Sequence, residues 1–203
     1  MKTEILKIKG DWQDVMNDCR ASVKKPPLMR EPSTEFKKNL LISEHSPLRG
    51  LWIRFQWLDL PYWVAMHWKT HIWPGIVNTQ RSDRQQEYDR NAARQDKPIN
   101  FYGEMNPQHA IDTMRKRLCY QASDLTRQYA EDFKRALREI EPEIANVLVP
   151  NCVYRCGCPE KGISTKKCEW YEKAVAKHPD LASTDIQTRY DTYNMIFYAK
   201  KGD

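Results

Sequence analysis

The sequence predicts a mixed fold of α-helices and β-strands, and three observations support this. Every second residue between Leu51 and Trp57 is apolar and shares one face, which is typical of a half-buried strand. From Asn106 to Ile140, apolar residues recur every three or four positions, which is typical of helix. The 203 residues, of which 40% are hydrophobic, suffice for one domain with a sizeable core.

The first expected element is a short strand within residues 5–10. There Leu6 and Ile8 alternate with lysines, which is a strand pattern and not that of a signal peptide. Asp11 is a plausible N-cap for a helix that runs to about Val23, where a Lys-Lys-Pro-Pro stretch ends it.

Two further helices are expected on either side of the Leu51–Trp57 strand. Ser33 can cap the earlier one. Pro61 suits the first turn of the later one, which extends from Tyr62 to about His71. After it we expect a polar loop over residues 80–100.

The longest helical pattern begins at Asn106 and can be broken near Ser123 and Asp124. Pro142 and Pro150 close this region. The last fifty or so residues are rich in cysteine, then polar, and end in an aromatic stretch.

Charge and hydropathy restrict the classes of partner. The net charge is +6, which suits a nucleotide, a nucleic acid or another anionic partner. No apolar run approaches the roughly 20 residues that span a bilayer, so no membrane association is expected. We interpret the protein as cytoplasmic, in a cell or in a virus-infected host. Its six cysteines are then expected to be reduced or metal-bound.

Polar and basic residues in the second quarter of the chain and beyond are candidates for a nucleotide site. They are Gln80, Ser82, Arg84, Arg94, Arg115 and Arg117. Guanidinium groups and a hydroxyl can hold a phosphate dianion, and an arginine or an amide can contact the edge of a base. A basic loop beside a basic helix is also typical of a solvated surface, so the composition of this group alone does not decide.

Five segments occur in an informative order. They are His45-Ser46-Pro47, the strand around Trp52–Phe55, the helix from Pro61 to Thr70-His71-Ile72, the stretch Val77–Arg84, and Ala93–Pro98 followed by Asn106 and Arg117. In this order they resemble the flavin-dependent thymidylate synthases (the ThyX family), in which an Arg-His-Arg triplet leads to Ser-x-Asn-Glu-x-Ser-x-Arg. The resemblance covers roughly residues 1–145 and leaves residues 146–203 as a Cys-rich C-terminal extension.

The resemblance implies an α+β fold with a central antiparallel sheet and long helices, assembled as a homotetramer with shared active sites. It also implies a methyltransferase activity in nucleotide biosynthesis. In that reaction methylenetetrahydrofolate supplies the carbon, which C5 of dUMP receives, and FAD reduced by NADPH supplies the reducing equivalent.

Site residues transfer to this chain by position. The resemblance places Arg84 and Ser82 at the dUMP phosphate and Arg94 at the nucleotide. It places Arg117 at the uracil edge, where it polarises the base. Ser82 and Arg117 are therefore the expected catalytic residues, although Ser82 would position phosphate rather than attack. His67 and Gln80 fall at further nucleotide positions.

The flavin side is more altered than the nucleotide side. Ser46, His71 and Asn106 occupy flavin-contacting positions, whereas Gln108, Asp112 and Gln121 replace an Arg, an Asn and a His.

The signature itself departs from the family pattern as well. Thr70 and Ile72 stand where the triplet has arginines, and each lost charge-assisted hydrogen bond is worth about 1.5–3 kcal/mol. FAD can accordingly bind weakly, bind differently or be absent. Two alternatives stay open: an altered C5 chemistry such as hydroxymethylation, and a flavin-free module that binds nucleotides or nucleic acid.

Two groups of residues are candidate metal ligands. Cys152, Cys156, Cys158 and Cys168 lie close together in the sequence and could hold zinc or an iron–sulfur cluster, or remain free thiols. Cys19 and Cys119 are expected to be ordinary helix residues. His67 and His71 have a chelating spacing on one helix, but no acidic residue accompanies them, so a helix-end pair with Trp68 packed beneath is the alternative.

Overall fold

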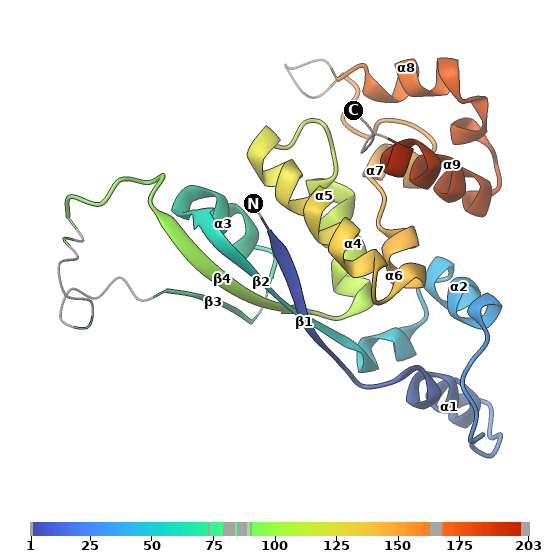
Figure 1. Ribbon diagram of the computed structural model, residues 1–203. Coiled ribbons are helices and arrows are strands. Elements are labelled where there is room, and N and C mark those ends of the chain that lie inside the picture. The colour runs from blue at the N-terminus through green and yellow to red at the C-terminus, as the bar shows by residue number, and fades with distance from the viewer. Residues whose placement is uncertain are drawn as a thin grey trace.

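The computed structural model describes residues 2–72, 74–78, 84, 89, 91–162 and 168–199. Its centre is an antiparallel four-stranded sheet with the order β1-β2-β4-β3. The strands are β1 (Thr3–Lys9), β2 (Trp52–Pro61), β3 (Gly75–Val77) and β4 (Pro98–Met105). Helices cover one face of this sheet (Figure 1). The expected combination of helices with an antiparallel sheet is therefore confirmed.

Strand β2 confirms the alternation expected for residues 51–57, because Ile53, Phe55 and Trp57 are all fully buried. The predicted polar loop was wrong at its C-terminal end. Strand β4 begins at Pro98 and pairs with β2 along its length. Its own alternation buries Ile99, Phe101 and Met105 against the helices, and this pattern was overlooked.

The N-terminal helices begin where the sequence predicts. They are α1 (Trp12–Ser22), α2 (Thr34–Ile42) and α3 (Tyr62–Lys69), with the short 3₁₀ helix η1 (Ser46–Gly50) before β2. Asp11 caps α1 by accepting from the backbone N–H of Asp14 over 2.7 Å, and Ser33 caps α2. Helix α3 ends at Lys69, two residues before the predicted end.

The long helical pattern forms two helices, so the expected break is confirmed. They are α4 (Pro107–Arg117) and α5 (Asp124–Arg138). Asn106 caps α4 and Ser123 caps α5. The remaining elements are α6 (Pro142–Val147), α7 (Asn151–Tyr154), α8 (Trp170–Lys177), the 3₁₀ helix η2 (Pro179–Ala182) and α9 (Ile186–Ala199). In the described part of the chain, no helix is both long and apolar enough to cross a membrane.

Aromatic side chains fill the space between the sheet and the helices. Trp57 packs against Trp68 of α3 with ring centroids 4.8 Å apart, and Phe55 packs against Phe133 of α5 at 4.9 Å. The indole N–H of Trp57 donates to the hydroxyl of Thr3 over 2.8 Å. This core fixes α3 and α5 on the sheet and so positions the residues at their ends.

The C-terminal helix α9 packs against α5 and α6 rather than standing apart (Figure 1). The fully buried Lys134 of α5 donates a hydrogen bond to Asn194 Oδ1 of α9 over 2.7 Å and another to the backbone oxygen of Ala145. Residues 146–199 thus share a hydrophobic core with the preceding region in the described structure, while the division of the chain at residue 145 stays a prediction.

Candidate functional site

Arg117, the expected base-contacting residue, lies at the C-terminal end of α4 against the end of α3. Its Nη2 atom donates to the backbone oxygen of His67 over 3.2 Å. Its Nε atom is buried and has no hydrogen-bond partner among the described residues. Burial also lowers the pKa of the guanidinium from its ordinary value. Arg117 therefore presents a partly desolvated donor edge that a ligand oxygen could satisfy.

Arg117 contacts His67 and lies within electrostatic range of His71, which in turn contacts His109; we call the group formed by His67, His71, His109 and Arg117 the His–Arg cluster. The Nδ1 atom of His67 lies 3.1 Å from the hydroxyl oxygen of Thr126, and a ring nitrogen of His109 contacts the backbone oxygen of His71. Burial, followed by the positive charges of Arg117, Lys116 and His109, lowers the pKa of His71. The cluster is thus a region of positive potential suited to an anionic group.

Arg94, the second expected nucleotide arginine, lies at the other end of α3. Its guanidinium is exposed and forms two hydrogen bonds to the carboxylate of Asp96, at 3.0 and 3.1 Å. The same turn is fixed to the start of α3, because the backbone N–H of Trp63 donates to the oxygen of Gln95 over 3.0 Å. Within one chain, Arg94 and Arg117 are not brought together.

The contacts of the remaining expected nucleotide-binding residues are largely undefined in the described structure. Gln80 and Ser82 lie outside the described residues. Arg84 is described and exposed. Their roles stay predictions.

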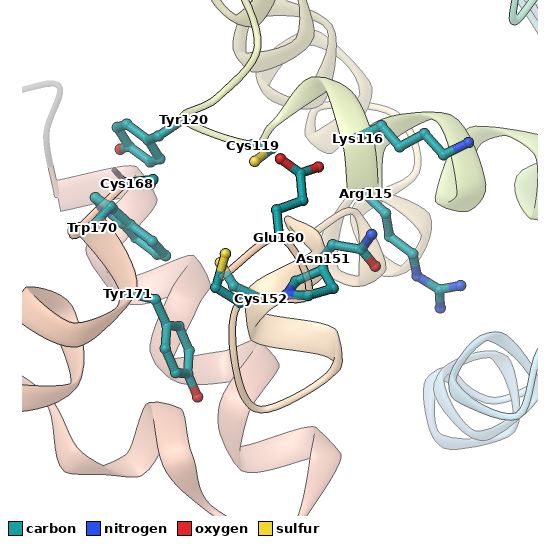
Figure 2. A pocket seen from close by; sticks show the side chains of 12 residues that line it. Arg115, Lys116, Cys119, Tyr120, Asn151, Cys152, Glu160, Cys168, Trp170 and Tyr171 are labelled. Atoms are coloured by element: carbon teal, nitrogen blue, oxygen red, sulfur yellow. The ribbon is translucent and has the colours of Figure 1, made fainter. Parts of the chain in front are cut away.

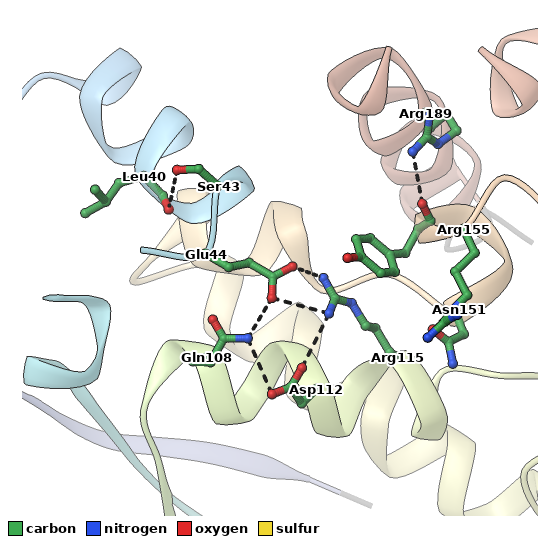
Figure 3. Close-up of polar contacts among 10 residues, drawn as sticks. Leu40, Ser43, Glu44, Gln108, Asp112, Arg115, Asn151, Arg155 and Arg189 are labelled. Atoms are coloured by element: carbon green, nitrogen blue, oxygen red, sulfur yellow. Dashed lines mark hydrogen bonds and ion pairs between the residues drawn. The ribbon is translucent and has the colours of Figure 1, made fainter. Parts of the chain in front are cut away.

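Two expected flavin-contacting residues belong to a polar network on α4 (Figure 3). Gln108 donates to the carboxylate of Glu44 over 2.6 Å and to Asp112 over 3.4 Å. Arg115 forms an ion pair with Glu44 and a longer one with Asp112, and its guanidinium stacks 3.5 Å from the ring centroid of Tyr154. Arg115 is buried and paired, which rules out the alternative of a solvated basic surface at this position, and its part in a nucleotide site stays a prediction.

The other expected flavin positions are spread over three turns. Ser46 begins η1, which packs against α4. Asn106 accepts from the backbone N–H of His109 over 2.8 Å as the cap of α4. Gln121 lies in the connection between α4 and α5, where its backbone N–H contacts Cys119 Sγ over 3.5 Å.

The cysteine cluster differs from the one predicted. Cys152, Cys158 and Cys168 line one cavity together with Cys119, whereas Cys156 is exposed outside it and donates to the backbone oxygen of Ala182 over 3.4 Å. The expectation that Cys119 is an ordinary helix residue was wrong, because it lies past the end of α4 in the cavity wall. Among the described residues, no group of three or more Cys, His, Asp or Glu side chains has the arrangement that holds a metal ion.

Sequence reasoning missed His109, Thr126 and Glu44. Each acts through a contact with a residue at least 38 positions away, and such contacts depend on how α3, α4 and α5 pack. The nearest sequence signal was the position of His109 on the same helix as Arg117.

Comparison with known proteins gives the same fold. No protein-family model and no curated protein sequence matches the chain. A solved structure of the flavin-dependent thymidylate synthase ThyX from Helicobacter pylori, complexed with FAD and dUMP, matches with a TM-score of 0.60 at 11% identity. The match covers 73% of this chain and 98% of that one. The chain has a ThyX-like fold.

A second ThyX structure from the same organism, also with FAD and dUMP, agrees. Its TM-score is 0.56 at 12% identity, and the match covers 73% of this chain and 97% of that chain. The ThyX-like fold expected from the order of short motifs is thus confirmed.

Proposed function

We propose that this protein is a flavin-dependent thymidylate synthase-like enzyme that adds a one-carbon unit reductively to C5 of dUMP. The observation that carries the proposal is the half-buried Arg117, whose Nε has no partner among the described residues and which lies beside His67 and near His71. The similar solved structures hold dUMP in the same fold. A pyrimidine oxygen is the kind of acceptor that such a donor edge fits.

The proposed role of Arg117 is electrostatic. When carbon is added at C5, negative charge develops on the pyrimidine oxygens, and a preorganised donor in a partly desolvated site stabilises it. The hydrogen bond from Arg117 to the backbone of His67 fixes the guanidinium before substrate arrives. No protein nucleophile is required in this scheme.

Flavin would supply the reducing equivalent when bound, with methylenetetrahydrofolate as carbon donor and NADPH as the source of electrons. Ser46, His71 and Asn106 are the residues that would contact it. The side chains of Gln108 and Asp112 already bond within the Glu44–Arg115 network and fit a cofactor less well. We therefore expect FAD to bind this chain through few side chains of α4.

An active site shared between subunits would allow both Arg94 and Arg117 to contact one nucleotide. Arg94 and Arg117 lie at opposite ends of α3 within one chain. In a homotetramer, Arg94 of one subunit could face Arg117 of another, as the family resemblance implies. The proposal therefore includes assembly as a condition for tight nucleotide binding.

Thermal stability and absorbance of the purified protein test this proposal together. We expect dUMP to raise the melting temperature more than AMP does, since a nucleotide that binds only the folded state stabilises it. We expect a flavin absorbance band, either as purified or after FAD is added. An unchanged melting temperature with every pyrimidine nucleotide would contradict the proposal.

A flavin-free binding module is the second candidate. It is favoured by the network that holds Gln108 and Asp112 and by the absence of arginines at Thr70 and Ile72. This candidate predicts binding to single-stranded nucleic acid that weakens steeply as salt rises, with no flavin absorbance.

A further inference from the structure

A small cavity at the junction of α4 with the C-terminal segment is lined by four of the six cysteines. It measures about 30 Å³, and the four are Cys119, Cys152, Cys158 and Cys168. Figure 2 shows Cys119 and Cys152 approaching it from separate segments, beside Trp170. A cavity needs roughly 10–15 Å³ of such space to hold one water molecule, so this one has room for a small ion.

The local backbone explains how distant cysteines meet here. Cys156 adopts a left-handed conformation with φ of 55°, and the backbone N–H of Gly157 donates to the oxygen of Cys152 over 2.9 Å. This turn reverses the chain, so that Cys158 returns beside Cys152 while Cys156 is left outside. A left-handed backbone is uncommon for a residue other than glycine.

The four thiols lie within mutual electrostatic range. Burial, followed by the proximity of Cys119, Cys158 and Cys168, raises the pKa of the Cys152 thiol. Burial likewise raises the pKa of Cys119, with contributions from the neighbouring Glu160, Cys168 and Cys158.

We propose that Cys119, Cys152, Cys158 and Cys168 bind one zinc ion as a tetrathiolate site that ties the end of α4 to the C-terminal segment. Zinc bound by four thiolates is a common structural arrangement. Binding releases the four thiol protons to solvent, and it requires the side chains to rotate toward the centre of the cavity. The site is separate from the proposed nucleotide function and does not depend on it.

Charged and aromatic side chains accompany the four cysteines. The cavity wall also contains Lys116 and Glu160, whose opposite charges balance each other, while the guanidinium of Arg115 is already paired with Glu44. Tyr120 and Trp170 stack with ring centroids 4.9 Å apart and an interplanar angle of 11°, which places two flat rings at the edge of the cavity. These rings form one side of the cavity wall.

Metal analysis of matched variants tests the ligand set. We expect about one zinc ion per chain in the wild type. We expect the Cys119→Ser variant to lose the zinc ion and the Cys156→Ser variant to keep it, because Cys119 lines the cavity and Cys156 does not. A wild-type protein without metal would overturn the proposal, and so would one that contains iron and sulfide. Loss of zinc in Cys156→Ser together with its retention in Cys119→Ser would also overturn it.

Thiol labelling of the wild-type protein tests the same set without any variant that could fail to fold. With iodoacetamide and mass spectrometry, we expect the exposed Cys156 to be alkylated while the four cavity cysteines are protected. Removal of metal with EDTA should then expose those four to labelling. An identical labelling pattern before and after EDTA, or protection of Cys156, would contradict a site built from Cys119.

Discussion

The Nη2 atom of Arg117 donates a hydrogen bond over 3.2 Å to the backbone oxygen of His67, which joins the C-terminal ends of α4 and α3. The bond leaves the buried Nε atom without a partner among the described residues. Since a buried donor without an acceptor costs about 1–3 kcal/mol, a ligand that accepts from it gains affinity.

Replacing Arg117 should therefore weaken both nucleotide binding and turnover. We expect Arg117→Ala to lower kcat about 10²–10³-fold, the usual effect of removing one oxyanion-stabilising donor. Steady-state kinetics with dUMP measures this. Arg30→Ala removes an equal charge from an exposed position and should leave kcat unchanged. Equal losses in the two variants would show that net charge, and not the position of Arg117, matters.

The Glu44–Arg115 ion pair should contribute to stability, because it is partly buried and supported by Gln108 and Asp112. We expect Glu44→Gln to lower the free energy of unfolding by about 1.5–3 kcal/mol, the range for hydrogen bonds to charged groups. Chemical denaturation provides the measurement, with the exposed Glu139→Gln as the matched control. If Glu44→Gln lowered the free energy of unfolding no more than the control does, the ion pair would contribute no more to stability than hydration of the two separate side chains.

Lys134 should make stability depend on pH. Burial, and then the charges of Arg138 and Arg135, lowers the pKa of its ammonium group well below the ordinary value. At pH values between the folded-state and unfolded-state pKa of this lysine, the unfolded chain binds more protons than the folded chain does. The free energy of unfolding therefore rises with pH across that interval.

The comparison with Lys134→Met isolates this effect. As pH is raised from about 7 to about 10, approaching the unfolded pKa of lysine, the wild type should gain free energy of unfolding relative to the variant. Denaturation curves at several pH values measure the difference. The exposed Lys177→Met should show no such trend. A difference that stays flat or declines with pH would contradict a depressed pKa.

Gly103 should not tolerate a side chain. A Cβ atom there would lie 2.6 Å from Phe55 Cζ and 3.0 Å from Phe101 Cε1, inside the aromatic core. Gly103→Ala should destabilise the protein by about 1–3 kcal/mol, as overpacking does. Gly50→Ala is the control, since the nearest atom to its added Cβ, Asp18 Oδ2, lies 4.0 Å away. Comparable melting temperatures for the two variants would argue against a rigid core at this point.

Features that depend on neighbouring residues were predictable from sequence. The caps at Asp11 and Ser33 and the break before α5 at Ser123 follow from local hydrogen-bonding chemistry. The alternation that forms β2 was visible for the same reason. The alternation of β4 was equally available, but the polar residues before it led to a predicted loop that extended to Asn100.

Features that depend on packing across the chain were not predictable. Cys119 is 33 positions before Cys152 in the sequence, whereas Cys156 is only four positions after it. Spacing alone therefore predicted Cys156 as the fourth cysteine of the cluster, although Cys119 is the one that lines the cavity. Glu44 and Arg115 are 71 positions apart, and nothing in the sequence indicated that the carboxylate would neutralise this arginine. Arg117 was identified only through the order of short motifs, which carries long-range information that periodicity lacks.

Release of tritium from dUMP labelled at C5 tests the central claim most directly, because adding any carbon at that position displaces the C5 hydrogen. With methylenetetrahydrofolate, FAD and NADPH present, we predict tritium in water that depends on the folate donor and is about 10²–10³-fold slower with Arg117→Ala. Mass analysis of the product then separates methylation from hydroxymethylation. No tritium release by the wild type, with flavin and reductant in excess, would contradict the proposed reaction.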